Sequence, residues 1–351
     1  MSSPGSAVAW IESLSPWPEK GFGLDRMHVL LERLGNPERA FPAIHVVGTN
    51  GKSTATRAIA ALLRAEGLRV GAYTSPHVSG WAERLDTDAA TFERALERIR
   101  PDAEAAEATQ FEALTAAALA QFAADGVDLA VVEAGLGGRL DATNVLDARV
   151  VLLTNVGLEH TDVLGSTREQ IAREKLAVVK PGAVVVTGEP EWAYLVPENE
   201  VVPGGPREAA AAFLGRPAVA DVEVTLPGRL ERLGREIRDG AHTPDGVDWL
   251  LERLPGRDYV LCVSILGDKD VDGMLARLAN VGTTLVATTS SNERALPAGE
   301  LARRARSYFP HVETVDDPTL ALARARELAG PGGPVLVTGS LYLLADLTLS
   351  D

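Results

Sequence analysis

The chain carries, at positions 45 to 54, the sequence His45-Val-Val-Gly-Thr-Asn-Gly-Lys-Ser-Thr54. An apolar, β-branched run that is typical of a buried strand passes directly into a glycine loop, and a helical pattern follows it. In such an arrangement, the backbone N–H groups of the loop and the amino end of the helix converge on one point, which favours phosphate binding. The segment therefore predicts a phosphate loop in an α/β protein.

Two side chains of this loop have distinct expected tasks. Lys52 is expected to reach the outer phosphates of ATP, and the hydroxyl of Ser53 is expected to bind Mg²⁺. We assign nucleotide binding to Gly48, Thr49, Asn50, Gly51, Lys52, Ser53 and Thr54. The full Walker pattern has a glycine where this sequence has Val46. A glycine turn in which Ser53 only caps the helix is therefore the alternative.

Short apolar runs alternate with longer helical patterns around this loop, which predicts α/β units and a mainly parallel sheet. The expected strands are Ile44–Val47, Val70–Tyr73, Leu129–Glu133, Val150–Thr154 and Ala183–Thr187. The clearest helical patterns between them are Thr54–Glu66, Phe111–Ala124 and Thr167–Val179.

A second series of the same kind follows residues 190 to 217, where prolines and glycines cluster. Its expected strands are Glu236–Asp239, Tyr259–Leu266, Thr284–Thr288, Val312–Val315 and Val335–Thr338, and its expected helices are Gly246–Glu252, Val271–Ala279, Pro297–Ala305 and Pro318–Leu328. A length of 351 residues suggests about two domains. We predict a central ATP-binding domain with a mainly parallel sheet over residues 1–222, and a Rossmann-like α/β domain over residues 223–351.

The composition limits the classes of partner. The net charge is −15, from 49 acidic and 34 basic residues, which opposes binding to nucleic acid and to anionic membranes. Met1–Trp10 lacks the basic start and the apolar run of a signal peptide, and no stretch of about 18 apolar residues occurs. The single cysteine, Cys262, lies in an apolar run and is expected in a core. We expect a cytoplasmic monomer whose partners are small molecules.

Further motifs accompany the phosphate loop in a fixed order. They are Tyr73-Thr-Ser-Pro-His77, Glu83-Arg84, Thr109-Gln-Phe-Glu112, Glu133-Ala-Gly-Leu-Gly-Gly-Arg-Leu-Asp-Ala-Thr-Asn144, Thr154-Asn-Val-Gly-Leu-Glu-His160, Ile171-Ala-Arg-Glu-Lys175, Pro227-Gly-Arg229, Asp239-Gly-Ala-His242 and Thr338-Gly-Ser-Leu-Tyr342. The loop resembles that of the Mur ligase superfamily, and the ordered set resembles its folylpolyglutamate synthase/dihydrofolate synthase family. The set is far more specific than any single loop.

The resemblance implies a site for two Mg²⁺ ions. Glu133 ends an expected strand, where ligands of parallel sheets bind, and the family places a magnesium ligand there. Ser53, Ser75 and His160 complete the metal ligands that the resemblance implies. The plainer alternatives are a solvated turn carboxylate for Glu133 and a hydrogen-bonded structural role for His160. Asp141, Thr143 and Asn144 follow the glycine cluster and are equally compatible with a helix cap.

The resemblance also implies roles for residues farther along the chain. In the family, the lysine that corresponds to Lys175 is carbamylated by CO₂, whereas a lysine on a helix is ordinarily solvated. Arg229, Asp239 and His242 match positions of the second domain that bind the nucleotide. Three features depart from the family pattern: Lys52 and Ser53 are adjacent where the family usually has a glycine between them, Thr243 replaces an asparagine, and the chain between Gly182 and Pro227 is dozens of residues shorter. We expect a reduced central sheet, with Ala209–Leu214 packed over part of the region left exposed.

The function that the resemblance implies is ATP-dependent amide-bond formation. A substrate carboxylate becomes an acyl phosphate, and the amine of L-glutamate then displaces phosphate, with Lys52, Glu133, His160 and Lys175 as the catalytic residues. The carboxylate belongs to dihydropteroate or to a folate. Two alternatives stay open: a Mur-type ligase for a different carboxylate, and a nucleotide-binding homologue without ligase activity.

Overall fold

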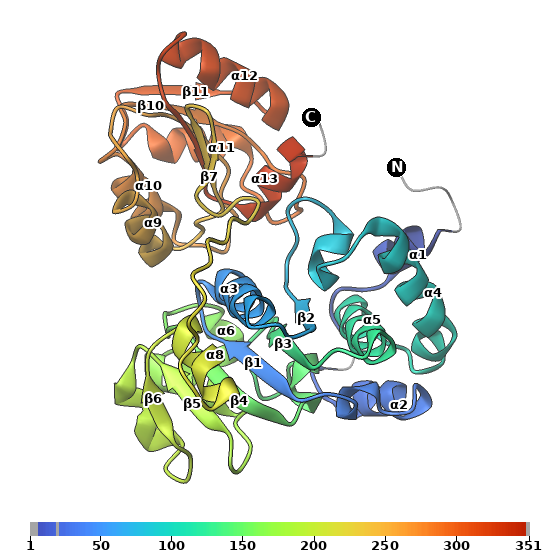
Figure 1. The fold of residues 1–351 in the computed structure, drawn as a ribbon. Helices are drawn as coiled ribbons and strands as arrows, with labels where there is room; N and C mark the ends of the chain where they lie inside the picture. Colours follow the sequence, from blue (N-terminus) through green and yellow to red (C-terminus); the bar gives the residue numbers. More distant parts are fainter. Residues whose placement is uncertain (1–5, 19–20, 349–351) are drawn as a thin grey trace. The chain divides into compact units, whose positions relative to one another are not determined.

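The structure is a computed structural model that describes residues 6–18 and 21–348. These residues form two compact units, each with its own sheet and helices (Figure 1). The first comprises the described residues up to Pro76 together with Trp81–Val224, and the second comprises His77–Gly80 and the described residues from Thr225 onward. The chain therefore passes between the units at residues 76/77, 80/81 and 224/225, of which the sequence pattern indicates only the last.

The first unit is built on a parallel six-stranded sheet in the order β2-β3-β1-β4-β5-β6. Its strands are β1 (Ala43–Val47), β2 (Val70–Tyr73), β3 (Leu129–Glu133), β4 (Ala148–Leu153), β5 (Val184–Thr187) and β6 (Val201–Pro203). The predicted α/β architecture with a mainly parallel sheet is confirmed. β6 was not predicted, because three residues that end in a proline carry too little apolar pattern.

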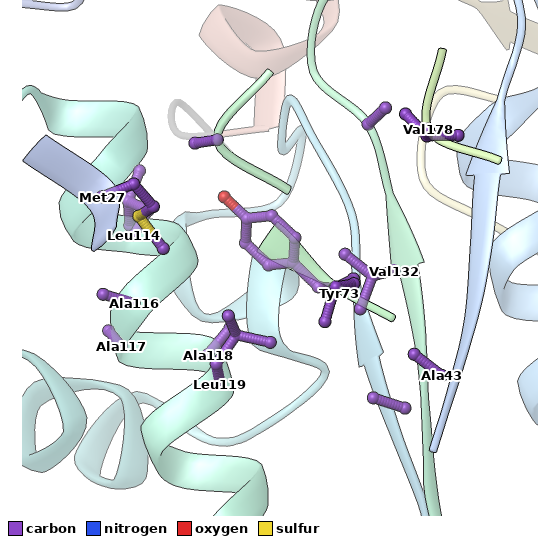
Figure 2. Close-up of a cluster of buried hydrophobic side chains, with 14 of the residues drawn as sticks. Met27, Ala43, Tyr73, Leu114, Ala116, Ala117, Ala118, Leu119, Val132 and Val178 are labelled. Carbon is purple, nitrogen blue, oxygen red and sulfur yellow. The ribbon is translucent and has the colours of Figure 1, made fainter. Parts of the chain in front are cut away.

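Helices cover both faces of this sheet, as the alternation of side chains along β1 requires. Ile44 and Val46 pack in one cluster with α3 (Lys52–Ala65) and α8 (Pro206–Leu214). Ala43 and Val47 belong to the cluster on the other face. The helices that contribute to it are α1 (Ala7–Ser13), α2 (Asp25–Arg33), α4 (Ala89–Ala105), α5 (Gln110–Asp125) and α7 (Arg168–Leu176). Figure 2 shows part of this second cluster, with Tyr73 between the sheet and α5.

α8 contains the helical segment expected at Ala209–Leu214, and it packs in the cluster of α3 on one face of the sheet. Ala209 and Ala210 are fully buried against the α3 cluster. Their small side chains permit close approach but bury little area. Because burial of apolar surface stabilises the fold by about 25 cal/mol per Å², each of these two residues contributes little. The chain that follows α8 is fastened to the end of α3, because the Glu66 carboxylate accepts hydrogen bonds from the N–H groups of Val219 (2.8 Å) and Ala220 (3.2 Å).

The second unit contains a mixed six-stranded sheet in the order β11-β10-β9-β12-β8-β7, in which only β7 runs antiparallel to its neighbour. The strands are β7 (Glu231–Leu233), β8 (Glu236–Asp239), β9 (Val260–Val263), β10 (Thr284–Ala287), β11 (His311–Thr314) and β12 (Val335–Thr338). The helices are α9 (Pro244–Leu251), α10 (Val271–Leu278), α11 (Ala298–Ala305), α12 (Pro318–Ala329) and α13 (Leu341–Thr348).

Two clusters cover the faces of the second sheet. One contains α9, α10 and α11, and the other contains α12 and α13 together with Cys262 and Val78. Cys262 is fully buried, as predicted, and burial raises the pKa of its thiol to about 12. Across the described parts of the chain, no helix combines the length and the apolar character needed to cross a bilayer.

Candidate active site

The phosphate loop connects β1, in the middle of the first sheet, to the amino end of α3. It is held by the segment that follows the neighbouring strand β4. The N–H of Thr49 donates to the Asn155 carbonyl (3.0 Å), and the N–H of Asn50 donates to Asn155 Oδ1 (2.9 Å). The Thr49 hydroxyl also accepts from the N–H of Gly157 (3.0 Å). The loop is therefore a fixed structure rather than a free turn.

Two glycines of the loop have positive φ angles, 147° at Gly48 and 78° at Gly51, but their surroundings differ. A Cβ on Gly48 would overlap Thr154 Oγ1, whereas nothing lies within 4 Å of a Cβ on Gly51. We expect Gly48→Ala to lower ATP-analogue affinity by at least about tenfold and to reduce the melting temperature, because strain and overlap add.

Gly51→Ala is the matched control. An alanine there has the unfavourable left-handed backbone, which costs about 1–2 kcal/mol, but its Cβ overlaps no other atom. Calorimetric titration with a non-hydrolysable ATP analogue measures both variants. Equal losses of affinity would contradict the overlap at Gly48.

Lys52 begins α3 and folds back over the loop. Its ammonium group donates to the carbonyl of Gly48 at 2.9 Å and to the carbonyl of Thr49 at 3.1 Å. The positive charge is thus placed at the loop itself.

Glu133 ends β3, the strand beside β1, and is only 2% exposed. One carboxylate oxygen accepts from the hydroxyl of Ser53 (3.0 Å), and the other accepts from the backbone N–H of Ser75 (3.0 Å). The fold thus brings together three predicted metal ligands that come from β3, from α3 and from the chain after β2. Ser75 contributes its N–H to this contact, whereas the sequence-based assignment concerned the residue as a metal ligand.

A carboxylate and a hydroxyl in contact at the phosphate loop fit a magnesium ion, which prefers a few hard oxygen ligands together with phosphate oxygens and water. His160 lies after β4, at the amino end of α6 (Thr161–Leu164), with a left-handed backbone (φ 43°). Among residues 6–18 and 21–348, no three His, Cys, Asp or Glu side chains form a ready metal cluster.

Lys175 on α7 is buried, with 1% of its side chain exposed, and is not the solvated lysine that helices usually carry. Its ammonium group donates to the Gly48 carbonyl (2.8 Å) and pairs with a Glu159 carboxylate oxygen (2.5 Å). Burial lowers the pKa of Lys175 to about 8, although the charge of Glu159 opposes this shift. Burial by itself would raise the pKa of Glu159, but the nearby charges of Lys52 and Lys175 outweigh it and lower the value to about 2.

Glu159 is a residue that sequence reasoning did not single out. It precedes His160 in the motif after β4. An acidic residue next to a suspected metal ligand could have marked it as a candidate site residue. What identifies it is its pairing with a lysine 16 positions later in the chain.

The residues after the glycine cluster behave as the capping interpretation predicts. Asp141 accepts from the N–H of Thr143 (3.0 Å) and also from the N–H of Leu136 (2.7 Å). The Thr143 hydroxyl donates to Asp141 (2.5 Å) and lies 2.8 Å from Nε2 of the buried His45. Burial lowers the pKa of His45 to about 3, with a further contribution from Lys180. This network supports the glycine-rich loop that begins after Glu133.

In the second unit, the three predicted nucleotide-binding residues gather at the end of β8. Asp239 is buried and accepts from the N–H groups of Leu230 (2.7 Å) and Ala241 (2.8 Å). Burial raises the pKa of Asp239, and the two N–H groups limit the rise. His242 donates from Nδ1 to the Gly240 carbonyl (2.9 Å), and Arg229 donates to the Gly228 carbonyl (3.2 Å).

Thr243, the departure from the family pattern, has a structural task in this turn. Its hydroxyl accepts from the N–H of Gly246 (3.1 Å) and caps α9. The substitution therefore preserves a helix start next to His242.

The chain matches known families and structures over most of its length. The Mur ligase middle domain matches residues 46–196, and the Mur ligase glutamate ligase domain matches residues 228–341. The folylpolyglutamate synthase of Lacticaseibacillus casei is 32% identical over an alignment of 419 positions, gaps included, and this alignment covers 96% of each chain. That alignment is longer than the whole of this 351-residue chain, so the relative carries residues that this chain lacks.

Two solved structures are similar across both units. The Mycobacterium tuberculosis folylpolyglutamate synthase complexed with ADP and AMPPCP gives a TM-score of 0.87 at 30% identity, with 98% of each chain covered. A bifunctional folylpolyglutamate synthase/dihydrofolate synthase with Mn, AMPPNP and L-glutamate bound gives a TM-score of 0.85 at 28% identity, covering 100% of this chain and 99% of that one. The domain matches, the sequence identity and the fold agree, and the chain belongs to the dihydrofolate synthase/folylpolyglutamate synthase family of ATP-dependent Mur ligases.

Proposed function

We propose that this protein joins L-glutamate to the carboxylate of dihydropteroate or of a folate at the expense of ATP. The observation that carries the proposal is the convergence of Lys52, Glu133 and Lys175 on one phosphate loop, in a chain of this family. A catalytically silent homologue has no need to keep a buried carboxylate and a buried lysine at this place, since both cost free energy to bury.

The reaction divides into two displacements. An oxygen of the acceptor carboxylate attacks the γ-phosphorus of ATP, the bond to the β-phosphate oxygen breaks, and ADP leaves. The α-amine of glutamate then attacks the carbonyl carbon of the acyl phosphate. The carbon–oxygen bond to phosphate breaks, the amine loses a proton, and inorganic phosphate departs. Lys52 and the N–H groups of the loop offset the charge on the transferring phosphoryl oxygens.

Ser53 and Glu133 would hold a first Mg²⁺ and His160 a second. Such ions neutralise phosphate charge and orient the nucleotide. The contact between Ser53 and Glu133 supports the first assignment, because it already places two hard oxygen donors together at the loop. Arg229, Asp239 and His242 are proposed to contact the nucleotide.

Lys175 is proposed to carry a carbamate during catalysis. Its burial and its lowered pKa, about 8, leave a larger share of neutral amine than an exposed lysine has, and only the neutral amine reacts with CO₂. The modification removes the cation that balances Glu159, so it suits a site in which divalent cations restore the balance.

We expect Lys175→Ala to be inactive and partly rescued by a small carboxylate, because the carbamate is absent. In the wild type, the neutral share of Lys175 rises with pH through about 8, so bicarbonate should stimulate more at pH about 8 than at pH about 6. Labelling with ¹³C-bicarbonate should give a carbamate signal that Lys175→Ala loses and Lys180→Ala keeps. A signal of equal strength in both variants would exclude carbamylation at Lys175.

Phosphate release from ATP, measured across a panel of carboxylates, tests the proposed function. We expect release only when L-glutamate and either dihydropteroate or a folate are present, with radiolabelled glutamate in the product. Turnover with another carboxylate alone would favour the alternative of a Mur-type ligase with a different acceptor. Nucleotide binding without turnover on the whole panel would favour the silent homologue.

A further inference from the structure

Three neighbouring strands of the first sheet, β1, β4 and β5, run parallel and end level with one another (Figure 1). Val47 at the end of β1 is paired with Leu153, and Leu153 is paired with Thr187 at the end of β5. The loops that follow these strands therefore lie beside one another at the carboxyl edge, where ligands of parallel sheets bind. The phosphate loop follows β1, and the loop that holds it, through Asn155, follows β4.

Glu189 stands in the third of these loops, two residues after β5. One carboxylate oxygen, Oε2, accepts hydrogen bonds from the N–H of Val156 (3.1 Å), from the Arg168 guanidinium (3.1 Å) and from Nε1 of Trp192 (2.8 Å). Hydrogen bonds to an ionised carboxylate are stronger than those to a neutral acceptor. Glu189 thus joins the loop after β4 to the first residue of α7 and to the segment that follows β5.

Arg168, the first residue of α7, holds the same stretch of backbone from its carbonyl side. Its Nε–H donates to the Val156 carbonyl (2.8 Å), and its guanidinium carbon lies 5.3 Å from the centre of the Trp192 ring. A guanidinium over an indole face is held there by cation–π attraction. Both backbone polar groups of Val156, which is 3% exposed, are therefore bonded to the Arg168–Glu189 ion pair.

Val156 lies between two residues that fasten the phosphate loop. Asn155 accepts from the N–H groups of Thr49 (3.0 Å) and Asn50 (2.9 Å). The N–H of Gly157 donates to the Thr49 hydroxyl (3.0 Å). Because each peptide unit is planar and rigid, a displacement of Val156 shifts both of its neighbours. All of these contacts lie within the first unit.

We propose that Glu189 is a positioning residue, which keeps the phosphate loop in its binding conformation by holding Val156 together with Arg168. Side chains that lock the groups around a site in this way are what gives the site its precise geometry. Glu189 was not a candidate from sequence, because its partners Val156 and Arg168 stand 33 and 21 positions earlier. The inference rests on the proposed function only in its expectation for nucleotide affinity, since the order of the loop can be measured without a ligand.

Glu189→Ala removes the acceptor of all three hydrogen bonds, and Glu191→Ala is its matched control. Glu191 pairs with the same Arg168 guanidinium, but at 3.7 Å and with 51% of its side chain exposed. Its loss removes an equal charge from the surroundings of Arg168 and leaves the contacts of Val156 in place. Hydrogen–deuterium exchange of the ligand-free protein, resolved to peptides that contain Thr49 and Asn50, compares the two variants.

We expect the amides of Thr49 and Asn50 to exchange about tenfold faster in Glu189→Ala than in Glu191→Ala, because only the first loosens the loop that carries their acceptor. Exchange in β3, on the other side of β1, should be the same in both variants. A difference confined to the phosphate loop separates local loosening from a general loss of stability. The dissociation constant of a non-hydrolysable ATP analogue should rise several-fold in Glu189→Ala alone.

Arg168→Met provides the comparison if Glu189→Ala does not fold. It removes the donor to the Val156 carbonyl, keeps an unbranched side chain beside Trp192, and should also speed exchange in the phosphate loop. Loop exchange equal to that of Glu191→Ala, or raised no more than exchange in β3, would overturn the proposal. A wild-type protein that binds no ATP analogue would contradict the proposed function instead, and the exchange comparison would still decide the role of Glu189.

Discussion

Lys52→Ala is expected to lower ATP turnover by about 10²–10³-fold, the usual cost of removing a group that stabilises charge in a transition state. The ammonium group of Lys52 donates to the carbonyls of Gly48 and Thr49, so this cation lies at the loop itself. Its loss removes the charge that faces the outer phosphates and leaves the loop backbone intact. Phosphate release at saturating ATP, together with thermal unfolding, measures both effects.

The fold should survive the Lys52 substitution. The two hydrogen bonds contribute about 1 kcal/mol each, and the loop stays fastened to Asn155 by Thr49 and Asn50. Lys180→Ala is the control, because it also removes one positive charge from the first unit. Lys180 donates to Asn144 Oδ1 (2.9 Å) and not to the phosphate loop, so this variant should retain turnover. Wild-type rates in a folded Lys52→Ala protein would rule out the phosphate-loop interpretation.

Glu133→Gln is expected to be as damaging to catalysis as Glu133→Ala, at much lower cost in stability. The glutamine keeps the shape and an oxygen that accepts from the Ser75 N–H, but it loses the charge that attracts Mg²⁺. The alanine variant also leaves a buried N–H without its partner, which costs about 1–3 kcal/mol. We expect a loss of about 10²-fold or more in the magnesium-dependent rate for both variants.

His160→Ala should also lower the magnesium-dependent rate. Its effect on the melting temperature should be smaller than that of Glu133→Ala. Titrating Mg²⁺ against phosphate release for the three variants, with thermal unfolding in parallel, separates metal binding from folding. If Glu133→Gln and His160→Ala both keep the wild-type rate and the wild-type magnesium dependence, the metal assignment is wrong.

Local patterns were sufficient for most of the fold. β1, β3 and the helix after the loop could be predicted because apolar runs and helical periodicity report the burial of each segment by itself. Glu133 could be singled out as a candidate for a related reason, since a carboxylate at the end of a parallel strand lies at the edge where ligands bind. α13 and the short β7 were missed, because neither carries a pattern that stands apart from its surroundings.

The glycine loop was predictable as well, because its function resides in consecutive backbone groups and one lysine. Pattern and motif order were therefore enough for the architecture, for the family resemblance and for the place of the glycine loop between β1 and α3.

Contacts between distant parts of the chain were beyond such patterns. Lys175 reads as a solvated helix lysine until the fold buries it against Glu159 and the carbonyl of Gly48, which lies 127 positions earlier. Val78 reads as part of the first unit until the fold places it in the core of the second. Periodicity records whether a side chain is buried, whereas the partner that neutralises a buried charge or fills a gap is chosen by tertiary packing.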